Sequence, residues 1–431
     1  MRKPTLILLI FSTLLPASIL LILTGCGSDR DRSCEVDPVI QTSKETSLDS
    51  VNIYIENSAS IYGYTTTFSE YINVVTDLAS FANIIDKTDA IFNYSLISGK
   101  GSGLTEYPLG NDASILSSVL SPSGLKKPTS ANSDINGMFN HVLKSLGENS
   151  ISILISDGIY DIGEESNPLA ALETQGIGTR TTFIKNLQEK NTETLVIKLS
   201  SEFDGQYYPG VTKSQETIKQ KRPYYIWIFG DEFLVDKFFS DDRIQALKGY
   251  QNHTAFKKLG YSEVKYTPFS IGNSNVRKSR SCNTFEVSRT VKPIEFTIAA
   301  DFNFIRLGEQ YFNDPSNYKI NLGYRLEECI RKEKYPDPEG KVANALKSVS
   351  FQPSHFLSIS SDQPILGQVE IALIPKLPSW IEESTMVSDS PLNGEENRTF
   401  GLSTLMNGIN EAYLEVSKAK EIFKLTINIT D

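Results

Sequence analysis

Short apolar segments alternate with amphipathic segments between residue 51 and about residue 260. Residues 51–55 alternate side chains with a period of two, which is typical of a strand. Over residues 68–82 the apolar side chains recur at helical spacing instead. Further strands are expected at 90–97, 151–155, 194–199 and 224–229, and further helices at 135–146, 181–190 and after Asp231. This alternation predicts an α/β domain over residues 50–260, with a doubly wound, mostly parallel sheet covered by helices on both faces.

The pattern changes after residue 261. Strand-like segments at 291–299, 351–360 and 368–374 are joined by long loops that contain Asn, Pro and Gly. One strong amphipathic helix follows at 402–416, and a terminal strand is expected at 423–429. We predict a second, strand-rich α+β domain over residues 261–431. The alternative is that the last helix and strand dock on the first domain.

The N-terminus has the three zones of a secretory signal. Arg2 and Lys3 precede an apolar run over residues 5–23, and this run ends in Leu-Thr-Gly-Cys at residues 23–26. The last four residues resemble the lipobox of bacterial lipoprotein precursors. The resemblance implies that residues 1–25 are a signal peptide and that Cys26 receives diacylglycerol and an acyl chain. A transmembrane anchor is the alternative, but Pro16 and the small residues before Cys26 argue against it.

Residues 26–49 are polar, charged and without periodicity, as expected for a flexible tether between lipid and domain. Gly27 follows the lipidated position. In the enterobacterial sorting rule an Asp at this position retains lipoproteins at the inner membrane, so the resemblance allows delivery to the outer membrane. We therefore expect a lipid-anchored protein of the bacterial cell envelope, with the periplasmic or surface side left open.

The charge balance excludes one class of partner. The chain has 42 Lys and Arg against 52 Asp and Glu, a net charge of −10. Removal of residues 1–25 takes away Arg2 and Lys3, so the mature chain carries 40 basic and 52 acidic residues and a charge of −12. A negative surface repels phosphate backbones, so a nucleic-acid partner is not expected.

The four cysteines are Cys26, Cys34, Cys282 and Cys329. With Cys26 acylated, an odd number of thiols remains. Cys282 and Cys329 lie in the same C-terminal region, and an oxidising compartment would allow them to form a disulfide. Two separate buried thiols are an equal alternative, because spacing in the sequence does not establish proximity.

Polar residues follow two of the predicted strands. Glu56, Ser58 and Ser60 come directly after the first strand, and Asp157 follows the strand at 151–155. Ser133 stands at the start of the helix between them. In open α/β sheets, ligands bind beyond the carboxyl ends of the strands. The sequence therefore predicts that these five residues form one site.

The five residues resemble the metal-ion-dependent adhesion site of von Willebrand factor A domains. That family places Asp-x-Ser-x-Ser after its first strand, a Thr at the start of a middle helix and an Asp in a Thr/Ser-Asp-Gly turn. The resemblance implies that Ser58 and Ser60 are hydroxyl ligands of a metal ion, that Ser133 takes the threonine position, and that Asp157 acts directly or through water.

This chain departs from the family at Glu56, where the family has Asp. Mg²⁺ requires near-octahedral geometry at about 2.0–2.1 Å, so the longer side chain favours the more permissive Ca²⁺ or no metal at all. Alternatively, the serines cap helices and satisfy turns without any ligand.

Three functional hypotheses follow. The first is a binding module that presents the metal site to a protein or glycan partner, and it fits an anchored protein best. The second is a metal-assisted hydrolase that uses Glu56 and Asp157 to activate water. The third is an architectural subunit of an envelope complex with a degenerate site. The three histidines, His141, His253 and His355, lack ligand spacing, so structural roles are expected for them.

Overall fold

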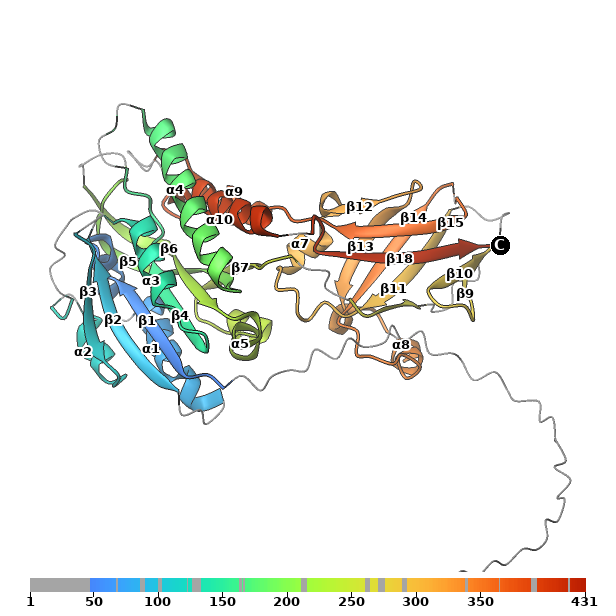
Figure 1. Ribbon diagram of the computed structural model, residues 1–431, viewed down its shortest axis with the longest axis horizontal. Coiled ribbons are helices and arrows are strands. Elements are labelled where there is room, and N and C mark those ends of the chain that lie inside the picture. Colours follow the sequence, from blue (N-terminus) through green and yellow to red (C-terminus); the bar gives the residue numbers. More distant parts are fainter. Residues whose placement is uncertain are drawn as a thin grey trace, which may run out of the picture.

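The computed structural model places two domains side by side along the long axis of the molecule (Figure 1). The predicted signal peptide, Cys26 and the predicted tether up to residue 46 lie outside the described residues. The structure describes residues 47–66, 69–85, 90–99, 103–121, 123–125, 133–162, 165, 167–210, 215–259, 264–269, 276–288, 293–337, 340–363, 365–388, 394–417 and 419–431.

The first domain is built around a seven-stranded sheet of order β3-β2-β1-β4-β6-β5-β7. Its strands are β1 (Ser50–Glu56), β2 (Ile91–Ser98), β3 (Thr105–Gly110), β4 (Ser150–Ser156), β5 (Glu193–Tyr207), β6 (Glu216–Gly230) and β7 (Tyr250–Phe256). The central strand β1 pairs in parallel with β2 and β4. The other neighbours, β2–β3, β4–β6, β5–β6 and β5–β7, are antiparallel. The sheet is therefore mixed, with a parallel centre and antiparallel outer pairs.

Helices cover both faces of this sheet. They are α1 (Glu70–Ile85), α2 (Ile115–Val119), α3 (Ile135–Ser145), α4 (Pro168–Glu189), α5 (Glu232–Phe238) and α6 (Asp241–Gln245). Alternate residues of β6 point to opposite faces. Trp227 accordingly packs against Phe139 of α3, while Tyr224 packs against Tyr71 of α1. The expected α/β layers are confirmed.

Two segments extend further than their patterns predicted. The pair β5–β6 continues as a hairpin to Tyr207 and Glu216, well beyond the expected strands at 194–199 and 224–229. Exposed charged residues alternate in this extension with buried ones such as Phe203 and Ile218, and cross-strand pairs such as Lys219 with Asp204 at 2.9 Å accompany the ladder. Helix α4 begins at Pro168, because Asn167 caps it by accepting a hydrogen bond from Ala170 N.

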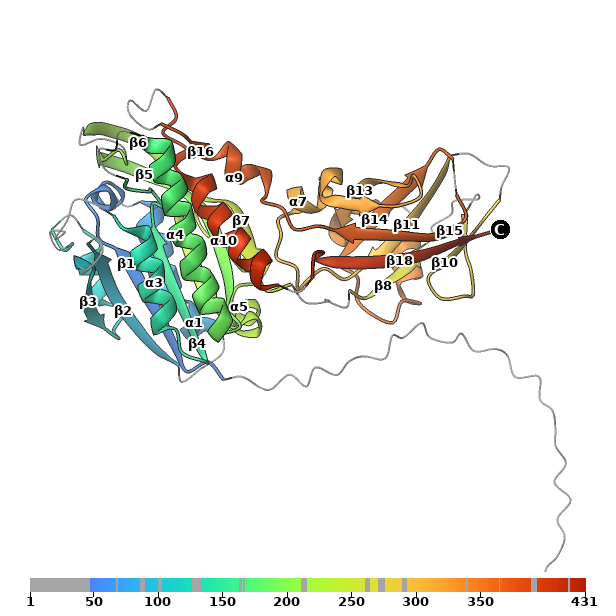
Figure 2. The same ribbon diagram turned by 45° about the horizontal axis from the view of Figure 1, so that its top comes forward.

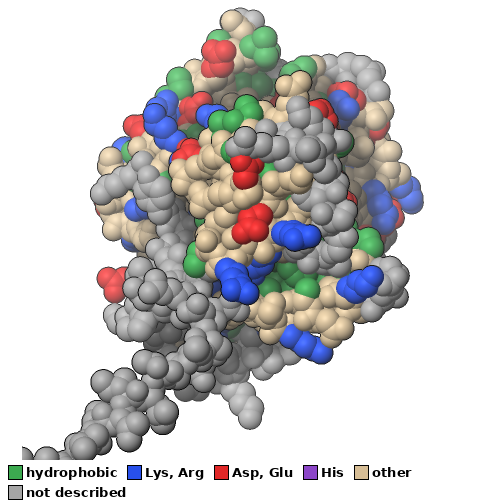
Figure 3. Space-filling view, turned by 90° about the vertical axis from the view of Figure 1, so that its right-hand side faces the viewer, with side chains coloured by type: hydrophobic (Ala, Val, Ile, Leu, Met, Phe, Trp, Pro, Cys, Tyr) green, Lys and Arg blue, Asp and Glu red, His purple; other side chains and the backbone are tan. Residues whose placement is uncertain are grey.

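The second domain consists of two further sheets, of order β12-β15-β18-β10-β9 and β13-β14-β11-β8. The strands are β8 (Tyr266–Phe269), β9 (Val276–Lys278), β10 (Thr284–Val287), β11 (Ile294–Ala300), β12 (Tyr318–Ile320), β13 (Arg325–Arg331), β14 (His355–Ser361), β15 (Gly367–Leu373) and β18 (Phe423–Thr430). Short helices α7 (Glu309–Asn313) and α8 (Lys341–Leu346) and the 3-10 turns η3 (Pro315–Asn317) and η4 (Lys332–Lys334) connect them. The sheets share one core, to which Ile298 and Leu357 contribute from one and Val369 and Leu425 from the other. On the end face of this domain, acidic and basic side chains are interspersed (Figure 3).

The prediction that residues 261–431 form the second domain is wrong for residues 379–416. The elements α9 (Ser379–Glu383), β16 (Thr385–Met386), β17 (Thr399–Phe400) and α10 (Leu402–Val416) belong to the first domain. Figure 2 shows α10 beside α4 over the sheet of that domain. The apolar face of α10 requires an apolar partner, and the two sheets of the second domain already cover each other. Strand β18 returns to the second domain. The alternative that the last helix and the last strand both dock on the first domain is therefore correct for the helix α10 and wrong for β18.

No helix in the described part of the chain is long and apolar enough to cross a membrane.

Helices α4 and α10 approach closely at a pair of glycines. A methyl group at Gly408 would lie 2.7 Å from the carbonyl oxygen of Gly176, and one at Gly176 would lie 2.9 Å from Thr404 Cγ2. Both contacts are shorter than van der Waals distance. The absence of side chains at these positions therefore sets the spacing of the two helices.

Replacement of Gly408 by Ala is expected to destabilise the protein. The added methyl group meets a backbone oxygen, and overpacking of this kind costs about 1–3 kcal/mol, more than the gain of up to about 1 kcal/mol in helix propensity. Urea denaturation measures the change. Asn407→Ala, on the exposed face of the same helix, is the control and should be neutral or stabilising. Equal stability of Gly408→Ala and wild type would contradict the close helix contact.

Candidate functional site

The structure brings the five predicted site residues together at one edge of the sheet. Strands β1 and β4 pair in parallel, with Ile55 opposite Ile155, so Glu56 and Asp157 leave the sheet at neighbouring positions. Ser58 lies in the loop after β1, and Ser60 begins the 3-10 helix η1 (Ser60–Thr65). Ser133 is placed beside them by an isolated parallel bridge to Gly99, directly after β2. The strand-end cluster is defined here as Glu56, Ser58, Ser60, Ser133 and Asp157.

Three members of the strand-end cluster are joined by hydrogen bonds. The hydroxyl oxygens of Ser58 and Ser60 lie 3.0 Å apart. Ser60 Oγ donates to Asp157 Oδ2 at 2.5 Å, and the backbone N–H of Ile159 donates to Asp157 Oδ1 at 3.2 Å. Gly158 adopts a φ of +70°, which turns the chain after Asp157 and favours glycine at this position. The carboxylate of Asp157 is thus held in a fixed orientation.

Glu56 is the unusual member of the cluster. Its side chain is completely buried, and neither carboxylate oxygen has a hydrogen-bond partner within the described residues. Burial, followed by repulsion from Asp157, raises the pKa of Glu56 to about 7. The hydroxyls of Ser133, Ser156 and Ser58 lie close enough to lower this pKa in part, but none reaches the carboxylate in hydrogen-bond geometry. An unsatisfied buried polar group is costly, so this position favours a proton or a cation.

Ser133 and Asp157 add an unpaired buried hydroxyl and a second buried carboxyl group to the cluster. Ser133 Oγ is also buried and has no partner in the described part of the chain. Burial raises the pKa of Asp157, and this rise is opposed by the bonds from Ser60 and Ile159 and by the charge of Arg222. Two carboxyl groups with raised pKa values therefore share one buried space.

This set of oxygen atoms fits a hard divalent cation. Octahedral ligands at the Mg²⁺ distance lie about 3 Å from one another, which matches the separation of the Ser58 and Ser60 hydroxyls. The unpaired oxygens of Glu56 and Ser133 would supply further ligands. The described residues contain no group of three or more His, Cys, Asp and Glu arranged for a metal, so the candidate ligands combine two carboxylates with hydroxyls. Such ligands suit Mg²⁺ or Ca²⁺ better than softer transition metals.

Sequence reasoning missed Arg222, which lies near the cluster on the extended part of β6. Its side chain is 2% exposed, its guanidinium carbon lies 4.2 Å from the centre of the Tyr207 ring, and its Nη1 has no described partner. No local motif marks Arg222, because the long β5–β6 hairpin brings it to the site. The aromatic residues beside the cluster are also buried: Tyr64 stacks on Tyr71 at 5.3 Å and donates its hydroxyl to Pro223 O at 2.6 Å.

The three histidines lie in contacts away from the cluster. His141 Nε2 lies 2.7 Å from Glu106 Oε2. His253 is buried, with Nδ1 2.8 Å from Tyr250 Oη and Nε2 3.4 Å from Asp241 Oδ1. His355 packs against both Phe302 and Phe312, and burial lowers its pKa to about 4.

The predicted pairing of Cys282 with Cys329 is wrong. Cys329 is a free, buried thiol on β13, where burial raises its pKa to about 12. Cys282 is disulfide-bonded. Its partner is therefore not Cys329. Sequence spacing gave no basis for deciding whether this pair forms.

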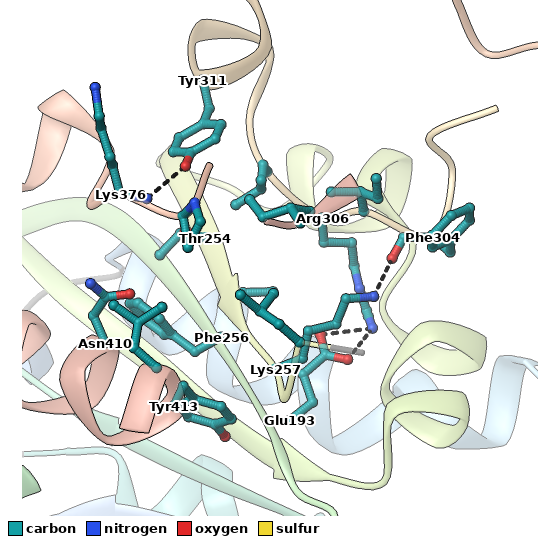
Figure 4. Close-up of a pocket in the computed structure, with 17 residues that line it drawn as sticks. Glu193, Thr254, Phe256, Lys257, Phe304, Arg306, Tyr311, Lys376, Asn410 and Tyr413 are labelled. Carbon is teal, nitrogen blue, oxygen red and sulfur yellow. Dashed lines mark hydrogen bonds and ion pairs between the residues drawn. The ribbon is translucent and has the colours of Figure 1, made fainter. Parts of the chain in front are cut away.

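A small cavity lies far from the cluster, at the junction of the two domains (Figure 4). Glu193 of the first domain and Arg306 of the second form a buried ion pair at 2.8 Å along its wall. Burial raises the pKa of Glu193 to about 7 despite this partner. The cavity has a volume of about 50 Å³ and a mostly apolar lining, which leaves room for little more than water. We interpret the cavity as a packing gap in the interface between the two domains.

The raised pKa of Glu56 makes stability depend on pH. Without a divalent cation, the unfolded chain releases this proton near pH 4.5, whereas the folded protein retains it up to about pH 7. The stabilisation of the folded state by the proton on Glu56 is fully present below pH 4.5 and is lost as the pH rises through 7. The free energy of unfolding changes by at most about 3 kcal/mol over this range. Glu56→Gln, which is always neutral, should lose less stability than wild type between pH 5 and pH 8. Urea denaturation in chelator measures this difference.

The control for that experiment is Glu189→Gln, at an exposed position on α4, which should follow the wild-type pH profile. Parallel pH profiles for wild type and Glu56→Gln would contradict a raised pKa at Glu56.

The structure brings the five predicted positions together, and the antiparallel outer half of the sheet departs from the doubly wound, mostly parallel sheet that the sequence predicts. Comparison of the chain with protein-family models, with curated proteins and with solved structures gives no match.

Proposed function

We propose that this chain is a lipid-anchored envelope protein whose first domain binds a protein partner with the help of a divalent cation in the strand-end cluster. The observation that carries the proposal is the buried carboxylate of Glu56, which has no hydrogen-bond partner among the described residues and lies beside the unpaired hydroxyl of Ser133. The resemblance to von Willebrand factor A domains and the lipobox at residues 23–26 support it.

A cation would resolve the electrostatic conflict at the cluster. Glu56 and Asp157 repel each other when both are ionised, and burial penalises both charges. A divalent ion offsets the two negative charges and supplies the coordination that Glu56 and Ser133 lack. The length of the Glu56 side chain favours Ca²⁺ over Mg²⁺, because Ca²⁺ accepts more variable ligand distances.

The surroundings of the cluster restrict how a partner approaches. Ser58, Ser60 and Asp157 are at most 8% exposed, and Glu56 is fully buried. Ser133 is half-buried as a residue, although its hydroxyl oxygen is buried. A carboxylate from a partner protein is the group that completes a shell of this kind, as the resemblance implies.

The alternatives have less support. A hydrolase would use Glu56 and Asp157 to activate water, but the described histidines all lie in other contacts. An architectural protein with a degenerate site would have no need for a buried, unpaired carboxylate. An apolar residue at position 56 would avoid the cost of the buried carboxylate, and this chain carries Glu there.

Calorimetric titration of Ca²⁺, Mg²⁺ and Mn²⁺ into the full chain in detergent tests the cation site. Saturable binding is expected, with Ca²⁺ binding tightest. Because the ion must displace the proton of Glu56, affinity should rise by up to about tenfold per pH unit below pH 7. The Ser58→Ala, Ser60→Ala double variant should lose this binding.

The matched control is the Ser117→Ala, Ser118→Ala double variant, which removes two exposed hydroxyls of helix α2 that bond only to nearby backbone carbonyls. It should bind the cation as wild type does. Absence of saturable binding to wild type, or equal loss in both double variants, would refute the cation site.

The lipid anchor is tested separately. Cys26→Ser removes the atom that receives the lipid, so the protein should move from the membrane fraction to the soluble fraction after cell disruption. Metabolic labelling with a radiolabelled fatty acid should mark wild type and not the variant. A Ser33→Ala variant, which leaves every cysteine in place, serves as the control and should keep both the label and the membrane association.

A further inference from the structure

A larger cleft lies at the same domain junction, next to the small cavity, with which it shares Tyr311 and Lys376, and separate from the strand-end cluster. It has a volume of about 370 Å³, within the range of small-molecule sites, and such sites are common between domains. Gln245, Tyr250 and Asn252 line it from the first domain, together with Trp380 at the start of α9. The opposite wall comes from the segment that includes α7 and η3 of the second domain. We refer to it as the interdomain cleft.

The two walls of the interdomain cleft are tied together by an ionic network. Arg331 of the second domain lies 2.7 Å from Asp241 of the first. The same guanidinium lies 3.0 Å from Glu309, which also pairs with Lys334 at 2.5 Å. Asp241 in turn contacts buried His253. These contacts hold the cleft open in one arrangement, so a ligand would meet a preformed site.

The charges of the cleft balance. The lining contains two acids, Glu309 and Asp314, and two lysines, Lys334 and Lys376. Glu309 pairs with Lys334 and with Arg331, whereas Lys376 Nζ donates to the backbone oxygen of Ser316 and Asp314 Oδ1 accepts from Ser316 N at 2.9 Å. The lining therefore carries no net charge that would attract a charged ligand. The electrostatics of the cleft therefore favour an uncharged ligand.

Three carboxamides of the cleft have no hydrogen-bond partner among the described residues. The side chains of Gln245, Asn252 and Gln310 make no hydrogen bond within the described residues, and each carboxamide offers two donors and an acceptor. Trp380 is 4% exposed, and its buried indole N–H also lacks a described partner. The hydroxyl of Tyr250 is occupied by His253, which leaves the ring as an apolar surface.

We infer that the interdomain cleft binds a short, uncharged oligosaccharide. Sugars carry many hydroxyl groups that are both donors and acceptors, which matches the carboxamides, and their C–H faces pack on aromatic rings such as Tyr250. The lining offers few aliphatic side chains, Leu377 and Pro378 among them, so an apolar peptide side chain would find little to pack against. This site is independent of the cation proposed at the strand-end cluster.

Tryptophan fluorescence gives a direct test, because the chain has only two tryptophans. Trp227 is fully buried in the core of the first domain, and Trp380 lines the cleft. In a Trp227→Phe variant of the full chain, emission therefore reports on Trp380 alone. Titration with N,N′-diacetylchitobiose, a neutral disaccharide, is expected to give a saturable change in emission.

Substitutions in the cleft sharpen the test. Asn252→Ala should weaken binding by up to about tenfold, the effect of losing one hydrogen bond. Gln368→Ala, which removes an exposed carboxamide from β15 outside the cleft, should leave the affinity unchanged. Calorimetry on wild type and Asn252→Ala provides a second readout that does not depend on the folding of Trp227→Phe.

The outcomes separate clearly. A saturable signal that Asn252→Ala weakens and Gln368→Ala does not supports the inference. No saturable signal by either method overturns it, as does equal or tighter binding of a disaccharide of the same size that carries a carboxylate. Because chelator should leave sugar binding intact, failure of the cation site and failure of the cleft are distinguishable.

Discussion

The parallel pairing of β1 with β2 and β4 is the constraint on which the candidate site depends. Strand β4 is buried along its whole length, and β1 is buried from Ile53 onward, so neither strand can shift its register without exposing apolar side chains. Parallel strands end at the same edge of a sheet. The loops after β1, β2 and β4 therefore converge, and Glu56, Ser133 and Asp157 meet although about a hundred residues separate the first from the last.

The same convergence places two carboxyl groups that repel each other in one buried space. Two acids at neighbouring strand ends share a space with little solvent, and the serines around them satisfy Asp157 but leave Glu56 unpaired. Functional sites are the places where a fold tolerates such costs. The proposed cation relieves this cost, and the proton on Glu56 below pH 7 is the substitute when no cation is bound.

The path of the chain fixes how the two domains sit. It crosses between them after β7, after β15 and after α10, and the buried pair of Glu193 with Arg306 lies at the junction. Truncation of one partner would leave the other charge buried and unpaired, which is strongly unfavourable. Several connections, rather than one flexible linker, therefore join the two domains (Figures 1 and 2).

The sequence by itself determined the local features. Periodicity located β1, β2, β4 and α10 within a few residues, Asp231 was a recognisable cap, and the five residues of the strand-end cluster were identified because the residues next to strand ends carry the chemistry of such sheets. Tertiary structure alone decided the antiparallel pairing of β4 with β6, the docking of α10 on α4, the free state of Cys329 and the position of Arg222. The physical reason is the distance along the chain over which each feature is determined. Periodicity and capping depend on neighbours along the chain, whereas pairing partners, disulfides and packed helix faces depend on which surfaces remain uncovered once the whole chain has folded.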